Sequence, residues 1–232
     1  MQKVSELYRT IFENSLHEKE VRINIAGVDY TQTNIVSATV YGGMYNPFGI
    51  GNAAARQITL EILPLGEIPR QAEIKVFVRL VLGEQKSEWL QKGVFFISKR
   101  NADKRTGALK IEGFDAMLKS ESVWLTSDYD TENWPMPQID AVRDIAYRMG
   151  VEVDERTVLS TEFPVAYPID ENGDLTMREV LSYIAVSNAG NWVITDEGKL
   201  LLIGTGDLPP ETNYLITEYG SAITFGGVRI LV

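Results

Sequence analysis

The most regular feature of the chain is an alternation of apolar and polar residues between residues 58 and 114. An apolar residue at every second position is typical of a strand that buries one face. These apolar positions are Ile58, Leu60 and Ile62, then Ile74, Val76, Val78 and Leu80, and finally Leu109 and Ile111. Pro and Gly turns separate the runs. The pattern therefore predicts an antiparallel meander.

Two further runs, residues 21–25 and 35–41, extend the same pattern toward the N-terminus. Several hairpin-connected strands without intervening helices indicate a small barrel or a strongly bent sheet. The Gly-rich loop 42–52 lacks the spacing and the Lys-Ser/Thr pair of a phosphate-binding loop. We interpret it as a wide barrel loop, with a protein contact through its apolar residues as the alternative.

The first 20 residues are predicted to hold a helix. Its apolar residues recur at helical spacing and form one stripe: Val4, Leu7, Tyr8, Ile11 and Phe12. Such a stripe packs either on the chain's own sheet or on a neighbouring subunit. Candidate assembly contacts are Leu7, Ile11 and Phe12 of this helix and Met44, Tyr45 and Phe48 of the loop.

The composition changes after Trp124. Residues 126–137 are acidic and rich in turn formers, which indicates a linker or domain entrance. A helix is predicted over 138–149 with Gly150 as its stop. A second helix begins at Thr176, where the spacing to Glu179 is that of a capping box.

A hairpin follows over residues 192–203, with a Gly-containing turn. Residues 214–218, 222–225 and 228–232 then have the pattern of strands that open another sheet. An apolar strand at the last residue would leave an unpaired edge, so we expect that the chain is the front part of a longer protein, or that another chain pairs with it.

Together these patterns predict an α+β fold that is mainly β. The expected domains are an N-terminal helix in 1–20, a small antiparallel β-barrel in 21–125, an inserted α/β domain in 126–203, and a linker with the first strands of a second, incomplete barrel in 204–232.

Composition narrows the possible chemistry. The chain has 232 residues, no cysteine and a single histidine, His17. Disulfides, cysteine nucleophiles and cysteine-based zinc sites are thereby excluded, and triads or metal sites that use several histidines are disfavoured. No apolar run approaches the roughly 20 residues that cross a bilayer, and the charged N-terminus does not resemble a signal peptide.

The net charge of −10 argues against a protein that grips phosphate backbones. The basic cluster of Lys99, Arg100, Lys104 and Arg105 lies in a turn between two strands, and we interpret it as a solvated hairpin tip.

No residue is nominated as catalytic, metal-binding or cofactor-binding. The acidic segments 128–132 and 170–174 lack the glutamate that completes an EF-hand loop, and Asp in turns usually serves its own backbone. The segment 204–206, Gly-Thr-Gly, precedes prolines instead of the helix that a nucleotide fingerprint requires. We expect no cofactor.

The order of the pieces resembles a known family. GVDYTQTNIVSATVYGGMYNPFGIGNAAARQITLEILP, IPRQAEIKVFVRLV and SEWLQKGVFFISKRNADKRTGALKIEGFDAMLK look like the first barrel of phage and prophage tail-hub proteins. WPMPQIDAVRDIAYRMGV and DLTMREVLSYIAVSNAGNWVITDEGKLLLI resemble the inserted domain that follows it. The likeness rests on the order of these segments and on their residue patterns, and it covers nearly the whole chain from Val21 onward.

The resemblance implies a structural subunit without enzymatic activity, made in the bacterial cytoplasm and built into a virion tail or a phage-like contractile injection system. Such baseplate hubs are homotrimers that join the tail tube and distal tail proteins to the central spike or tip. Two barrels per subunit form their pseudo-sixfold ring, whereas this chain is expected to hold one complete barrel and only the beginning of a second. DNA would pass the lumen without specific binding, and no membrane insertion is expected.

Two alternatives of other classes remain at this point. One is a tail-associated cell-wall-degrading enzyme, which a concentrated acid pair in a cleft would favour. The other is a carbohydrate-binding module that uses exposed aromatic residues such as Tyr45 and Phe48.

Overall fold

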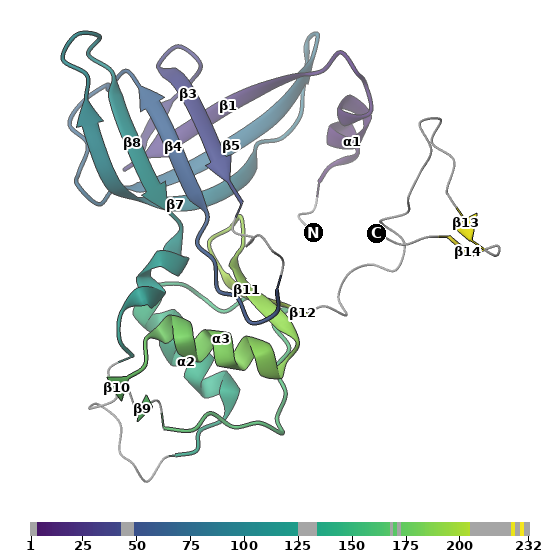
Figure 1. The fold of residues 1–232 in the computed structure, drawn as a ribbon. Coiled ribbons are helices and arrows are strands. Elements are labelled where there is room, and N and C mark those ends of the chain that lie inside the picture. Colours follow the sequence, from purple (N-terminus) through teal and green to yellow (C-terminus); the bar gives the residue numbers. More distant parts are fainter. Residues whose placement is uncertain are drawn as a thin grey trace.

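The computed structural model describes residues 4–42, 49–124, 134–167, 169–170, 173–204, 224–225 and 228–229. A curled antiparallel sheet forms one part of the molecule, and two helices packed on a hairpin form the other, which we call the distal unit (Figure 1). The predicted α+β, mainly β class is confirmed.

The curled sheet follows the N-terminal helix α1 (Glu6–Phe12). The strands run in the spatial order β2-β1-β5-β7-β8-β4-β3, and β6 pairs with β5. Their bounds are β1 Glu18–Ile25, β2 Val28–Tyr30, β3 Ile35–Tyr41, β4 Gln57–Ile62, β5 Glu73–Leu82, β6 Gln85–Lys86, β7 Leu90–Ala102 and β8 Leu109–Phe114.

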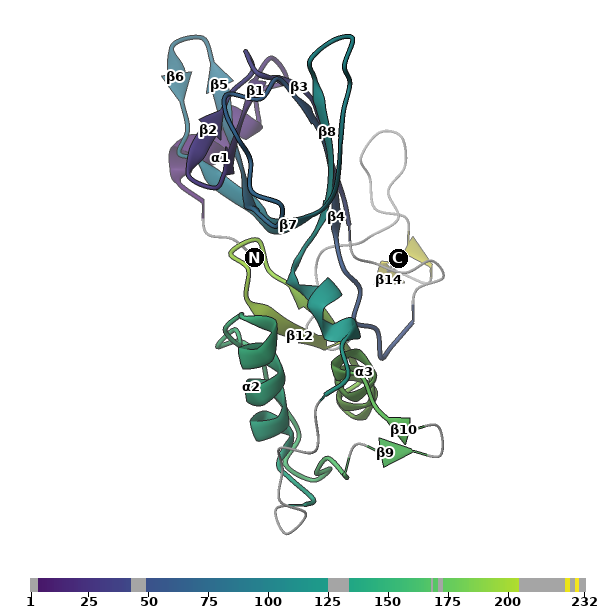
Figure 2. The same cartoon turned by 90° about the vertical axis from the view of Figure 1, so that its left-hand side faces the viewer.

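Irregular pairing accompanies the curl of this sheet (Figure 2). The register shifts within β3, between β5 and β7, and between β7 and β8. At the second shift Val76 faces Gly93 and Phe77 faces Gln91, so Lys92 is the extra residue. A bulge bends its strand and increases the local twist. Among the described strands no ladder joins β2 to β3, so the barrel is open along that line.

The apolar residues of the alternating pattern that predicts the strands also fill the interior of the barrel. Its core is a cluster of Ile23, Ile25, Tyr30, Ile58, Leu60, Ile62, Ile68, Ala72, Ile74, Val76, Phe95, Ile97 and Ile111. Facing positions match across the ladders, because Ile23 lies opposite Val76 and Leu60 lies opposite Ile111. Burial of these apolar side chains is the main favourable term for the barrel.

The distal unit begins with a short 3₁₀ helix that sequence patterns did not predict. Its described elements are η1 Ala116–Glu121, α2 Gln138–Met149, β9 Ile169–Asp170, β10 Gly173–Asp174, α3 Met177–Ser187, β11 Gly190–Ile194 and β12 Leu200–Gly204. A separate short pair, β13 Thr224–Phe225 and β14 Val228–Arg229, falls where strands were predicted.

The ends of both long helices follow their predicted signals. Gly150 closes α2 in the left-handed conformation, with φ of 72°, which a glycine adopts without steric cost. At the start of α3 the Thr176 hydroxyl accepts from the Glu179 N–H, and the Glu179 side chain accepts from the Thr176 N–H. Both halves of the predicted capping box are therefore present.

The β11–β12 hairpin gains one neighbour on each side. Ala53 bridges to Trp192 in parallel fashion, and Val153 bridges to Leu200. The Gly51 N–H donates to the carbonyl oxygen of Gly190 at 2.9 Å. The chain thus runs along the distal sheet before it enters the barrel as β4.

A second apolar core lies between this sheet and the helices. It is formed by residues from η1, α2, α3 and the hairpin, together with Ala53 and Trp124. The indole N–H of buried Trp192 donates to the carbonyl oxygen of Leu181 at 2.7 Å, which ties the hairpin to α3. The predicted domain boundaries stay predictions, while Ala53 belongs to the distal core and Ala55 packs against it.

Candidate assembly surfaces

The N-terminal helix divides its apolar stripe between the chain's interior and solvent. Ile11 is fully buried, whereas Leu7, Phe12 and Leu16 are exposed at 42%, 58% and 80%. The ring of Phe12 stacks on Tyr8 with centroids 6.3 Å apart, and it lies 5.8 Å from the ring of His17. We call the exposed residues Leu7 and Phe12 of α1 and Leu16 just after it, taken together, the α1 patch.

Hydrogen bonds fix the start of α1 on the sheet. The Ser5 hydroxyl oxygen caps the helix by accepting from the Tyr8 N–H at 3.0 Å. The backbone N–H and hydroxyl of Ser5 donate to the Glu88 carboxylate at 2.7 and 2.6 Å. Although burial pushes the pKa of Glu88 upward, these hydrogen bonds outweigh it and hold the pKa below its usual value. The α1 patch is therefore presented from a fixed position.

The predicted contact residues fall into two groups. Leu7 and Phe12 lie on the exposed α1 patch, while Ile11 packs inside the chain. Met44, Tyr45 and Phe48 lie outside the described residues. Their role in assembly stays a prediction.

Strand β3 presents a second exposed apolar surface. It pairs with β4 and ends the spatial order of the sheet. Val36, Val40 and Tyr41 are 57%, 40% and 54% exposed. A free edge with apolar side chains is a template for another chain. Sequence patterns located this strand but gave no sign that it lies at an edge.

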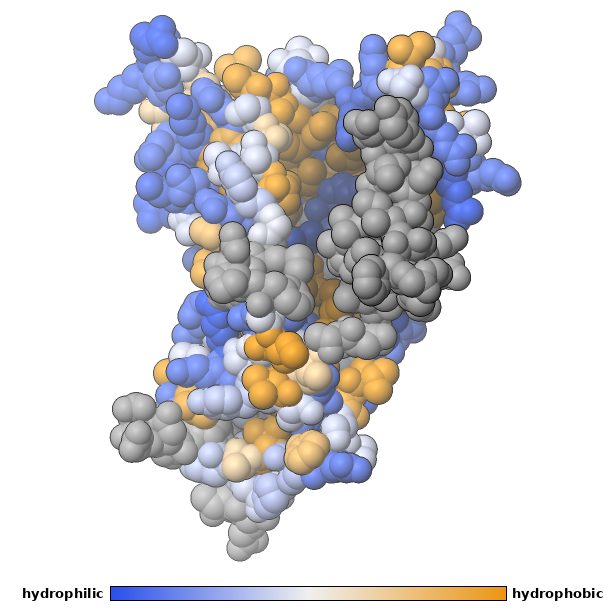
Figure 3. Space-filling model, turned by 45° about the vertical axis from the view of Figure 1, so that its right-hand side comes forward, coloured by the Kyte–Doolittle hydropathy of each residue, from blue (hydrophilic) through white to orange (hydrophobic). Residues whose placement is uncertain are grey.

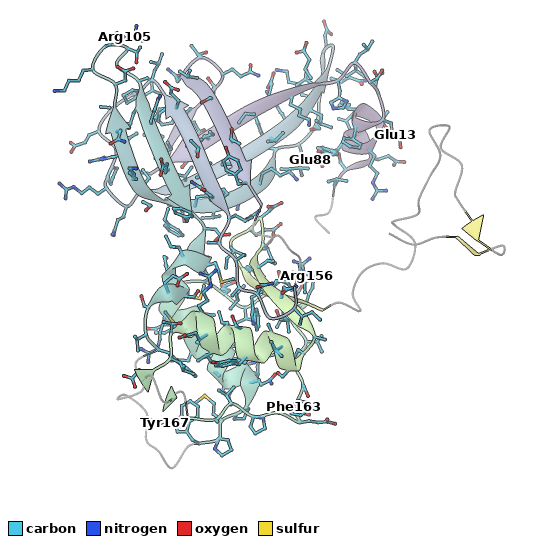
Figure 4. The ribbon with its side chains drawn as sticks, in the orientation of Figure 1. Glu13, Glu88, Arg105, Arg156, Phe163 and Tyr167 are labelled. Atoms are coloured by element: carbon cyan, nitrogen blue, oxygen red, sulfur yellow. The ribbon has the colours of Figure 1, made fainter. Side chains whose placement is uncertain are left out.

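An apolar groove of about 350 Å³ lies beside α3. Its walls come from α2, α3 and the segment 163–167, and they include Gln138, Phe163, Tyr167, Tyr183 and Ser187. Figure 4 labels Phe163 and Tyr167 in this part of the distal unit, and Figure 3 shows apolar side chains on the surface of that unit. The Gln138 amide N–H donates to the Ser187 hydroxyl at 2.8 Å, so these polar groups already serve each other.

Arg56 joins the two parts of the molecule. Its Nε donates to Asp115 Oδ2 at 3.4 Å, and its Nη1 donates to Asp196 Oδ1 at 2.8 Å. Its Nη2 donates to the carbonyl oxygen of Thr195 at 3.1 Å. Arg56 precedes β4, Asp115 follows β8, and residues 195–196 lie in the β11–β12 turn. One guanidinium therefore holds the barrel against the distal hairpin.

The Asp115 carboxylate is almost completely buried at this junction. It accepts from the backbone N–H groups of Arg56 and Met117, both at 3.1 Å. Burial is the largest influence and raises the pKa of Asp115 to about 6, while these donors and the Arg56 charge oppose the rise. The arrangement is structural, because the carboxylate is occupied by its own backbone and by Arg56.

The described residues were compared with the requirements of a metal site and of a membrane-spanning helix. Over those ranges no group of three or more His, Cys, Asp or Glu side chains is placed to hold a metal ion. Within the same part of the chain no helix is long and apolar enough to span a membrane.

The comparisons with known proteins concern the fold. No family model matches the chain, and no curated protein matches it in sequence. Among solved structures, a tail protein from Neisseria meningitidis aligns with 14% identity and a TM-score of 0.53, over 86% of this chain and 56% of that one.

Two further solved structures align at lower TM-scores. A 43 kDa tail protein of prophage MuSo2 from Shewanella oneidensis gives 11% identity and a TM-score of 0.49, over 81% of this chain and 56% of that one. Prophage tail protein gp18 from Listeria monocytogenes gives 6% identity and a TM-score of 0.47, over 86% and 55%.

The chain thus shares its fold with the Neisseria tail protein while spanning about half of that protein's length. At these identities the likeness concerns architecture.

Proposed function

We propose that the chain is a structural, non-enzymatic subunit of a phage or phage-like tail. The observation that carries this proposal is the fold shared with a tail protein across 86% of the chain. The exposed β3 edge and the α1 patch support it, because a building block needs surfaces that other subunits cover.

The proposed place is the tail hub, as a homotrimeric ring between the tail tube or distal tail proteins and the central spike or tip. The open line between β2 and β3 supports a ring, since neighbouring copies can cover edges that the chain leaves unpaired. The net charge of −10 per chain is compatible with a lumen that repels passing DNA.

Mass photometry of the purified chain, followed by electron microscopy of the particles, tests the assembly. We expect a species of three copies that forms rings. Replacing Val40 with Lys on the β3 edge is expected to reduce the trimer fraction, because a charge would have to be desolvated on pairing. Replacing exposed Val158 with Lys is the matched control. A monomer at all concentrations would contradict the proposal.

A glycan-binding role is the second candidate, and the exposed Phe163 and Tyr183 beside the groove favour it. Aromatic faces stack on sugar rings, but a sugar also needs free polar partners, and Gln138 and Ser187 are bonded to each other. Glycan-array binding that is lost in Tyr183→Ala would support this candidate over a purely structural role.

A further inference from the structure

The positive and negative charges of the chain are segregated along the molecule. Residues 99–110, which form the end of the β7–β8 hairpin, hold five basic residues and one acidic residue. The described residues between 134 and 204, which form most of the distal unit, hold five basic and eleven acidic residues, a net charge of −6. The acidic character of the whole chain is therefore concentrated at one end.

The basic hairpin has a rigid tip. The Asp103 N–H donates to the Ala108 carbonyl oxygen, and the Gly107 N–H donates to the Asp103 carbonyl oxygen, both at 2.8 Å. The Asp103 carboxylate accepts from the N–H groups of Arg105 and Thr106 at 2.8 and 3.4 Å. The single acid of the segment is thus occupied by its own turn, and the tip needs little further ordering when it binds.

Most cations of the hairpin are free for a partner. Arg100 donates to the carbonyl oxygen of Ile68, but Lys99, Lys104, Arg105 and Lys110 are exposed and make no ion pair with any described residue. Arg105 lies at the end of the barrel remote from the distal unit (Figure 4). Basic tip and acidic unit therefore cannot meet within one molecule.

We propose that the basic tip of the β7–β8 hairpin docks on the acidic distal unit of a second copy of this chain. Charge complementarity steers such an encounter and fixes the orientation of the partners. Because the contact joins two different surfaces, it is heterologous and can close into a ring. The inference rests on the proposed assembly in requiring that copies meet, and it specifies which surfaces do so.

Nucleic acid is the less suitable partner for the tip. A long polyanion bound there would extend along a molecule whose net charge is −10, and its phosphates would be repelled. A compact acidic protein surface contacts the tip alone, which lies remote from the acidic unit of its own molecule.

Sedimentation velocity of the full chain at low and high salt tests the proposal. We expect the association to weaken at high salt, because exposed charges are screened beyond about 3 Å in 1 M salt. The hairpin variant Lys104→Glu/Arg105→Glu is expected to raise the dissociation constant at least roughly tenfold at low salt, through repulsion from the acidic unit.

The matched control is Lys19→Glu on strand β1, compared with the single hairpin variant Arg105→Glu, because both cations are exposed and neither forms an ion pair with a described residue. It should associate nearly as the parent does. A combined variant adds Glu155→Lys/Glu162→Lys in the distal unit to Lys104→Glu/Arg105→Glu in the hairpin. It should restore part of the association, since acidic residues of the hairpin then face basic residues of the distal unit. Both glutamates are exposed.

The outcomes separate the two proposals. If the parent assembles and the hairpin variant assembles equally well, the docking is wrong while the structural function stands. If the parent is monomeric at every salt concentration, both are wrong. Binding of a short DNA duplex that the hairpin variant loses, with unchanged self-association, would assign the tip to nucleic acid and overturn the docking proposal.

Discussion

At the scale of single residues, Asp115 shows how a buried carboxylate depends on its donors. Arg56 and two backbone N–H groups face it, yet burial dominates and raises its pKa to about 6 from an ordinary 3.8. Such a group favours the fold more strongly when it carries its proton.

This shift predicts a decline in stability as the pH rises from about 4 to about 6. In that window the folded protein retains a proton that the unfolded chain has released, so raising the pH removes stability. The contribution is at most about 3 kcal/mol. Asp115→Asn should flatten the decline, as measured by urea unfolding at successive pH values.

Asp154→Asn is the contrasting variant. The Arg156 side chain hydrogen-bonds Asp154 and lowers its pKa to about 2, so its contribution is present above about pH 4 and is lost as the pH falls toward 2. The variant should lose this stabilisation at all pH values above about 4, and it should change the slope of stability against pH only in the acidic range. An unchanged slope between pH 4 and 6 in Asp115→Asn would contradict the assignment.

At the scale of elements, the capping box of α3 is predicted from a local sequence signal and is present in the structure. Thr176→Ala removes the hydroxyl that accepts from the Glu179 N–H at 3.2 Å, and it also removes a donor to the Glu179 carboxylate. We expect a loss of about 1 kcal/mol in the free energy of unfolding. Thr161→Ala, at an exposed position outside the helix, should change it by less than about 0.5 kcal/mol. Equal losses would show that the cap contributes nothing.

Local signals explain which elements were predictable. The strand alternation, the Gly150 stop and the Thr176 cap depend on neighbours within a few residues, and all three are confirmed. The 3₁₀ helix η1 was missed, because its Asp115 cap works together with contacts to Arg56 far away in sequence.

The candidate surfaces were less predictable for a related reason. A helical stripe shows that α1 is amphipathic, but the sheet decides that Ile11 is buried and Phe12 is exposed. Edge position is likewise a property of pairing order, so the sequence of β3 alone does not reveal it. The Arg56 junction joins segments about 60 and 140 residues apart, beyond any spacing rule.

At the scale of the whole molecule, two cores meet through Arg56. Its side chain is 17% exposed, and replacing it leaves the Asp115 charge buried without its partner. Arg56→Met should therefore cost about 3 kcal/mol. Because the buried Trp124 and Trp192 belong to the distal core, their fluorescence should then report a transition separate from far-ultraviolet circular dichroism of the sheet.

Arg143→Met is the control for this experiment. Arg143 forms an exposed pair with Asp140 on α2, with a distance of 3.7 Å, and such pairs contribute little. The control should unfold as the parent does. Coincident transitions and unchanged stability in Arg56→Met would show that the cores are coupled by other contacts.

The route of the chain beside β11 has a practical consequence for engineering. Gly51 and Asn52 exchange backbone hydrogen bonds with Gly190 and Trp192, although more than 130 residues separate them in sequence. A graft of residues 126–204 onto a foreign scaffold would arrive without this flanking strand and would expose the margin of its own hairpin. A graft that also includes residues 49–55, as a separate peptide or a permuted segment, should keep the edge of the hairpin paired.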